Sequence, residues 1–175
     1  MIGARSCAPE LAKVLEKHIW YELARFVAQY ELLCEPKKYC AALNKDDVDD
    51  VEDALIVSFC THARNVLEFF WRPDRTQWNY VLATDYADAN YVRVEKTKGS
   101  DIDRLYVQLC KQINHLGLNR TDKSHEKIQA KERDELVVLI HDEIERLVNH
   151  HLKSGFANQY FARTSRRRKA KLAED

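Results

Sequence analysis

The sequence predicts an all-α fold, an antiparallel bundle of four to five long helices with an irregular aromatic-rich excursion between the second and third helices. Four Gly and three Pro in 175 residues are few for a β protein dense in turns. Apolar residues recur at helical intervals along most of the chain, and no alternating run of β-branched residues competes with them. Helices therefore account for most of the chain.

Composition sets the class of protein and its surroundings. With 45% apolar and 32% charged residues, the chain is typical of a globular protein; we expect one domain over 1–160 and a basic, flexible tail over 161–175. A formal net charge of zero leaves only local patches to argue for nucleic-acid binding. The five cysteines contain no Cys-x-x-Cys, which argues against a disulfide framework or zinc knuckle. No apolar run is long enough to span a membrane, so we expect a cytoplasmic protein.

The first helix is predicted to begin near Pro9 and to run to Cys34, because Pro is tolerated in a first turn and Pro36 stops the helix. The acidic run Asp46–Asp53 follows. Negative charge favours a helix N-terminus, and few neutral or His ligands flank the run. We therefore interpret this run as a helix start and expect no metal site there.

The second helix, over 48–71, is apolar around most of its circumference, which is typical of the centre of a bundle. Its apolar surface exceeds what three neighbours would cover, which indicates a homodimer. His62 lies at the edge of the main stripe beside Asn65, whereas Arg64 points to the far side with Glu68. His62 and Arg64 are therefore expected to diverge, and His62 is more simply interpreted as a hydrogen-bonded interior histidine than as a catalyst.

Residues 72–99 lack the periodicity of a long helix, and we expect an irregular excursion with a short helix over 83–90. Its aromatic residues could stack on bases, but a long ordered loop also needs packing of its own. Of these two interpretations we favour the second, in which the aromatic side chains pack the excursion against the bundle. The aromatics in question are Trp78, Tyr80, Tyr86 and Tyr91.

The third helix is predicted over 101–116, with Ser100 as N-cap and Gly117 as the stop. Polar side chains at successive turns form its outer row, which faces solvent, a partner subunit or a ligand. This row comprises Arg104, Gln108, Lys111 and His115. The fourth helix is predicted over 124–153. The basic tail Arg163–Lys171 either binds an anionic surface or nucleic acid, or is a disordered solubilising terminus.

His115 is the strongest candidate for chemistry. It lies between Lys111 and Arg120, and a histidine between two cations can act as acid or base on a phosphodiester without a metal. The alternative is that His115 interacts with the terminal carbonyls of its helix. Arg64 and Arg104 join Lys111 as candidate phosphate-binding residues. A supporting polar cluster is formed by His62, Asn65 and Asn114. No metal ligand set and no cofactor site are predicted.

The segments Leu55–Phe70, Val81–Tyr86 and Ile113–Arg120 resemble a group of bacterial helical proteins that is similar to the HEPN superfamily. The resemblance implies a helical bundle, often dimeric, whose active members cleave RNA through an Arg-x(4–6)-His motif facing the partner. His115 stands where that histidine would be. Residues 108–111 hold no arginine, which leaves Lys111 or Arg120 as an electrostatic substitute.

Two functional hypotheses follow. The first is a HEPN-like cytoplasmic bundle that binds RNA or a nucleotide, with metal-independent ribonuclease activity through His115 assisted by Arg120. The alternative is a non-catalytic bundle whose polar clusters are structural and whose exposed faces bind a protein partner in a bacterial system. Zero net charge favours the alternative, and the polar row of the third helix favours the first hypothesis.

Overall fold

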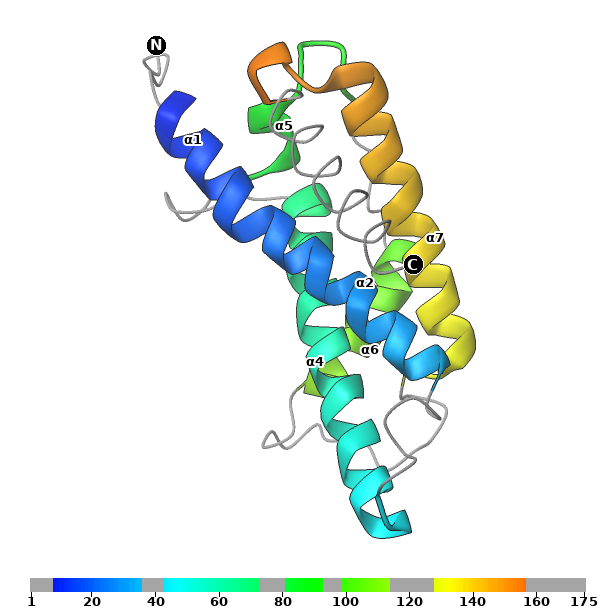
Figure 1. The fold of residues 1–175 in the computed structure, drawn as a ribbon. Coiled ribbons are helices and arrows are strands. Elements are labelled where there is room, and N and C mark those ends of the chain that lie inside the picture. Colours follow the sequence, from blue (N-terminus) through cyan, green and yellow to red (C-terminus); the bar gives the residue numbers. More distant parts are fainter. Residues whose placement is uncertain (1–7, 36–42, 73–80, 93–98, 114–127, 157–175) are drawn as a thin grey trace.

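The computed structural model describes residues 8–35, 43–72, 81–92, 99–113 and 128–156, and the regular structure of these ranges is helical. Figure 1 shows the first helical rod crossing the long helix α4, with α6 behind it and α7 alongside. In the described ranges the only β-type pairing is an isolated antiparallel bridge between Ala87 and Leu152. The predicted all-α bundle is therefore confirmed.

The first rod consists of α1 (Ala8–Val14), a π-helical turn (Leu15–Ile19) and α2 (Trp20–Cys34). It covers the range predicted from Pro9 to Cys34. Its core-facing side chains include Leu15, Leu23 and Phe26, which are almost fully buried. The rod ends at Glu35, whose backbone N–H donates to the carbonyl oxygen of Leu32 at 3.1 Å.

Helix α4 (Lys45–Trp71) is the central element and packs against α2, α6 and α7. It begins three residues before the predicted start at Val48 because Asn44 caps it: the Asn44 Oδ1 accepts the N–H of Asp47 at 3.0 Å. The acidic run forms its first turns, as expected. From Phe59 onward most of its apolar residues are buried, and the Phe26 and Phe59 rings stack with centroids 5.0 Å apart.

The excursion packs onto the bundle through its aromatics. Its helix α5 (Ala83–Tyr86) is shorter than the predicted 83–90. The Tyr86 ring is fully buried, and its hydroxyl donates to the carbonyl oxygen of Leu11 at 3.0 Å. Tyr91 is also buried. The packing interpretation is confirmed for these two tyrosines, whereas Trp78 and Tyr80 lie outside the described residues.

Helix α6 (Asp101–Ile113) begins as predicted, with the Ser100 Oγ accepting the N–H of Asp103 at 3.3 Å. Its predicted end at Leu116 and Gly117 lies outside the described residues. Helix α7 (Ala130–Arg146) continues into a π-helical turn (Leu147–His151). Helix α7 begins at Ala130, later than the predicted start at Ser124, and Ser124 lies outside the described residues. Gln129 caps the helix, and the Gln129 N–H donates to Glu132 Oε2 at 3.0 Å.

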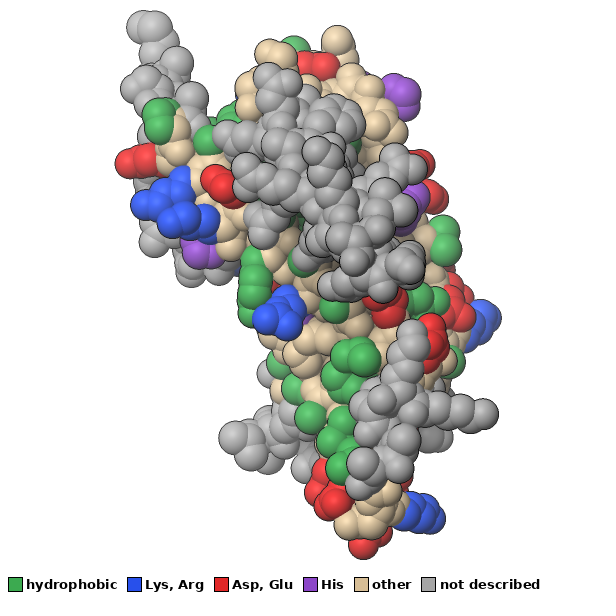
Figure 2. Space-filling model, viewed as in Figure 1, with side chains coloured by type: hydrophobic (Ala, Val, Ile, Leu, Met, Phe, Trp, Pro, Cys, Tyr) green, Lys and Arg blue, Asp and Glu red, His purple; other side chains and the backbone are tan. Residues whose placement is uncertain are grey.

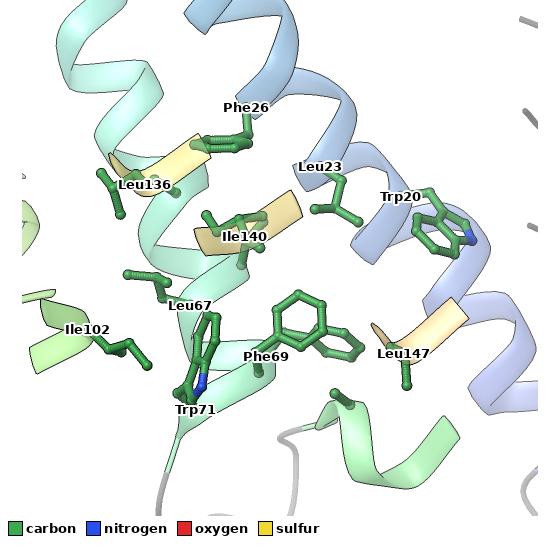
Figure 3. Packing of buried hydrophobic residues seen from close by; sticks show 14 of the residues in the cluster. Trp20, Leu23, Phe26, Leu67, Phe69, Trp71, Ile102, Leu136, Ile140 and Leu147 are labelled. Carbon is green, nitrogen blue, oxygen red and sulfur yellow. The ribbon is translucent and has the colours of Figure 1, made fainter. Parts of the chain in front are cut away.

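The core lies where the first rod, α4 and α7 meet. Figure 3 shows Phe26, Leu67, Leu136 and Ile140 converging from these three elements, with Ile102 entering from α6. Interdigitated packing of this kind fixes the helices relative to one another. Among the described helices, none is long and apolar enough to cross a membrane.

Candidate functional site

The expected catalytic residues His115 and Arg120, together with Asn114, lie outside the described residues. The other candidates from the sequence are described, and all of them except Lys111 belong to polar networks that join two helices. The described candidates are Arg64, Arg104, Lys111, His62 and Asn65.

His62 and Asn65 meet at the carboxylate of Glu22, across the α2–α4 interface. The His62 Nδ1 lies 2.7 Å from Glu22 Oε2, and the Asn65 Nδ2 donates to the same oxygen at 3.0 Å. Both His62 and Glu22 are largely buried, with 14% and 22% of their side chains exposed. The carboxylate therefore orients the imidazole with Nδ1 as the donor, in the way that a carboxylate positions a catalytic or structural histidine.

Two further side chains of α2 border this cluster. The Tyr21 ring meets the His62 ring edge-on with centroids 5.9 Å apart, and the Arg25 guanidinium lies 5.3 Å from the centre of the Tyr21 ring. Tyr21 is 44% exposed. The cluster thus combines an oriented imidazole, a cation and an exposed aromatic ring on one face, although no hydroxyl or thiol nucleophile is hydrogen-bonded to His62 within the described residues.

Arg64 points away from His62, as predicted, and belongs to a network between α4 and α6. Its Nε donates to Glu68 Oε1 at 2.9 Å, and the Tyr106 hydroxyl donates to the same oxygen at 2.9 Å. Arg72 donates to the other oxygen of Glu68 at 3.1 Å. Burial and then the bond to Glu68 raise the pKa of Tyr106 to about 12. Partial burial lowers the pKa of Arg64, but Glu68, Cys110 and Tyr106 together raise it by more, so the guanidinium stays charged and paired.

Arg104 is held between α6 and α7. Its guanidinium pairs with Glu135 at 2.5 Å and lies 3.6 Å from Asp101, and it also donates to Gln108 at 3.2 Å. The bond to Glu135 is the largest cause of a raised pKa for Arg104. Arg104 and Gln108, two members of the outer row on α6, are therefore hydrogen-bonded to each other, and Arg104 is also paired with α7. Lys111, in the last described turn of α6, also has a polar or electrostatic interaction.

A fourth network lies beneath the excursion. Glu143, only 4% exposed, accepts hydrogen bonds from the Tyr91 hydroxyl and from Arg146. Arg146 also donates to the carbonyl oxygen of Val92 and lies 5.1 Å from the centre of the Tyr91 ring. This carboxylate thus joins the end of α7 to the excursion, since a buried charge requires such partners.

The described candidates do not share one cleft. His62 faces α2, Arg64 faces α6, and Arg104 faces α7, and each guanidinium is paired with a carboxylate of the protein. Within the described ranges, no three His, Cys, Asp or Glu residues are grouped closely enough to hold a metal ion.

Sequence reasoning missed the carboxylates that complete these networks: Glu22, Glu135 and Glu143. Glu143 alone had a local signal, because it stands on the core stripe of its helix with Leu136, Ile140 and Leu147. A carboxylate on an apolar stripe indicates a buried polar network. Glu22 and Glu135 occupy ordinary polar positions, so only the packing of distant segments identifies their partners.

No family model, curated protein or solved structure matches this chain.

Proposed function

We propose that this chain is a non-catalytic helical bundle that binds a protein partner in the cytoplasm. The observation that supports this proposal is the pairing of the candidate cations. Arg64 and Arg104 were expected to contact phosphate, but each donates to a carboxylate of the protein. Releasing either arginine to a ligand would leave Glu68 or Glu135 without that partner, which costs free energy.

The surface of α2 offers a binding face of a different character. Tyr21, Ala28 and Leu32 recur at intervals of seven and four residues, so they share one side of the helix, and all three are exposed. Figure 2 shows hydrophobic side chains reaching the surface along α2 and the first half of α4. Arg25 lies on the same side, with its guanidinium over the Tyr21 ring, so the face combines apolar side chains with one cation. Helix faces with exposed apolar side chains are typical of surfaces that receive a partner helix.

The experiment compares the full chain with the variant Ala28→Arg/Leu32→Ser as bait for affinity purification, followed by reconstitution with the purified partner. Val138→Ser on α7 is the matched control, because it removes an apolar side chain that is 61% exposed on another face. We expect the partner to bind the wild type and the control, and to bind the α2 variant at least tenfold more weakly. A partner that binds all three equally would contradict this choice of surface.

The second candidate function is RNA or nucleotide binding, with metal-independent cleavage through His115 and Arg120. It is favoured by the outer row of α6, where Arg104, Gln108 and Lys111 follow one another at successive turns toward residues 114–120. Gln108 and Lys111 are each partly exposed on that helix. A polar row that leads to a histidine could position a phosphodiester beside it.

The assay for this candidate is cleavage and binding of single-stranded RNA at low salt in the presence of a chelator. His115→Ala should abolish cleavage and Arg120→Ala should weaken it, whereas His141→Ala, at an exposed position of α7, should leave it unchanged. All three variants should melt within a few degrees of the wild type. If the wild type neither binds nor cleaves RNA where electrostatic contacts are strongest, the protein-binding function stands alone.

A further inference from the structure

The first turns of α4 extend beyond the helices that cover the rest of it. The contacts Glu22–Asn65 and Gln29–Ser58 set α2 antiparallel to α4, so the last residue of α2, Cys34, is level with Asp53. Residues 45–53 therefore continue past the end of α2. Figure 1 shows this start of α4 projecting from the bundle. We name residues 45–53 the arm; it is about 13 Å long.

The other described neighbours also stop short of the arm. Tyr106 bonds to Glu68, and Cys110 lies near Arg64, so α6 runs antiparallel to α4 and its last described residue is level with Thr61. Arg133, in the first turn of α7, lies near Cys60. The arm therefore has no described helix packed along it, and its residues are exposed except for Val48, Val51 and Glu52, which are partly buried.

The arm carries far more negative charge than its helix requires. One Lys, five Asp and one Glu give it a formal net charge of −5. The favourable effect of the helix dipole is confined to the first turn, which holds Asp46 and Asp47. Asp49, Asp50 and Asp53 lie beyond that turn, where like charges three and four residues apart repel one another. These three carboxylates are exposed and form no ion pair within the described residues.

A basic segment of matching charge occurs in the same chain. Arg163–Lys171 contains four Arg and two Lys and no acidic residue, so its formal net charge is +6. The two segments balance each other within a chain whose net charge is zero. Opposite charges concentrated in two segments of one chain favour the association of these segments, especially at low ionic strength.

The tail is long enough to reach the arm of its own molecule. The Phe156 ring contacts Tyr86, which in turn contacts Phe69, so the described chain ends near the level of Phe69 on α4. The arm at Asp49 lies 20 residues earlier, about 30 Å along the helix. Ten residues from Phe156 to Arg166 span up to about 35 Å when extended, and Lys171 reaches further.

We propose that the basic tail Arg163–Lys171 docks on the arm of the same molecule. The arginines pair with the carboxylates of the exposed side of the arm, which relieves their mutual repulsion and neutralises both segments. This inference does not depend on the proposed function, because neither segment belongs to the α2 face or to the outer row of α6.

The experiment is zero-length carbodiimide cross-linking of the full chain, which joins a lysine amine directly to a carboxylate, followed by peptide mass spectrometry. We expect Lys169 and Lys171 to link to the arm, with a yield that is unchanged on tenfold dilution and that falls at high salt. The tail variant Arg166→Gln/Arg167→Gln/Arg168→Gln keeps both lysines, yet it should lower the yield about tenfold by removing three pairing charges.

The matched control is Lys13→Gln/Lys17→Gln/Arg25→Gln, which removes the same charge from exposed positions of the first rod and should leave the yield unchanged. Asp49→Asn/Asp50→Asn should lower linking to the remaining arm carboxylates. Lysine links spread evenly over acidic residues elsewhere, or arm links that persist in the tail variant, would overturn the proposal. A yield that falls in proportion to dilution would also overturn it, because docking would then join two molecules.

Discussion

Glu143→Ala should be the most destabilising change among the interhelical polar networks. Glu143 is 4% exposed and is the shared acceptor of Tyr91 and Arg146. Its removal leaves the buried Tyr91 hydroxyl without an acceptor, and Arg146 loses its ion pair. The change also opens space beside Tyr91, the side chain that fastens the excursion to α7.

The magnitude follows from these two lost partners. A hydrogen bond to a charged acceptor contributes about 1.5–3 kcal/mol, and breaking one side of a buried pair costs about 3–5 kcal/mol. The Arg146 side chain is 31% exposed, so water replaces part of its lost interaction. We therefore expect Glu143→Ala to lower the free energy of unfolding by about 3 kcal/mol, at the lower end of that range. Tyr91→Phe should cost about 1–2 kcal/mol, because Arg146 still pairs with Glu143.

Urea unfolding followed by circular dichroism measures these values, and the double variant Tyr91→Phe/Glu143→Ala measures the coupling between the two side chains. The double variant should be about 1–2 kcal/mol more stable than the sum of the single effects predicts. Glu145→Ala, at an exposed position of the same helix, is the control and should stay within about 0.5 kcal/mol of the wild type. A loss below about 1 kcal/mol for Glu143→Ala would refute a structural role for this carboxylate.

Three further predictions concern other sites. Burial raises the pKa of Cys60 to about 12. The contribution of this protonated thiol to the free energy of unfolding is therefore complete below its ordinary pKa near 9, and it is lost as the pH rises through 12. At pH 9 iodoacetamide should therefore modify the exposed Cys34 and spare Cys60, as read by mass spectrometry; equal modification of native protein would contradict this. Arg104→Ala should cost only about 0.5–1 kcal/mol in urea unfolding, since its pairs are partly exposed, and a cost above about 2 kcal/mol would show an underestimated contribution. Asn44→Ala should cost about 1 kcal/mol through loss of the α4 cap, and an unchanged unfolding midpoint would contradict the capping role.

The helices were predictable because their apolar residues follow one period over long stretches. The first rod and the end of α4 agree with the sequence to within a residue or two. The start of α4 lies three residues before the predicted Val48, because the periodicity of apolar residues does not identify a polar cap. Asn44 precedes an acidic run that already reads as helical, so only the bond between its side chain and Asp47 identifies the first turn.

For the polar clusters, the sequence predicted on which side of α4 each residue lies, but it did not predict which residue each one contacts. Helical geometry alone predicts that His62 and Arg64 lie on different sides of the helix. The structure confirms this, because His62 contacts Glu22 of α2, whereas Arg64 donates to Glu68, which also accepts the Tyr106 hydroxyl of α6. The partners themselves come from other elements, and Glu22 is 40 residues from His62. No spacing rule connects residues that far apart, because their meeting depends on how two helices pack.

The pairing of arginines with glutamates also changes how cations should be weighed as evidence of function. An arginine in a sequence is a candidate for phosphate binding only if its guanidinium is not already paired with a carboxylate of the protein. In this bundle Arg64, Arg104 and Arg146 are already paired with glutamates. Leaving a partly buried carboxylate unpaired costs more free energy than an exposed contact between arginine and phosphate contributes. Function that depends on charge is then expected where carboxylates and cations lack such partners. Among the described residues, the exposed carboxylates of Asp49, Asp50 and Asp53 meet this condition, and the basic tail of the same chain is the partner that we propose for them.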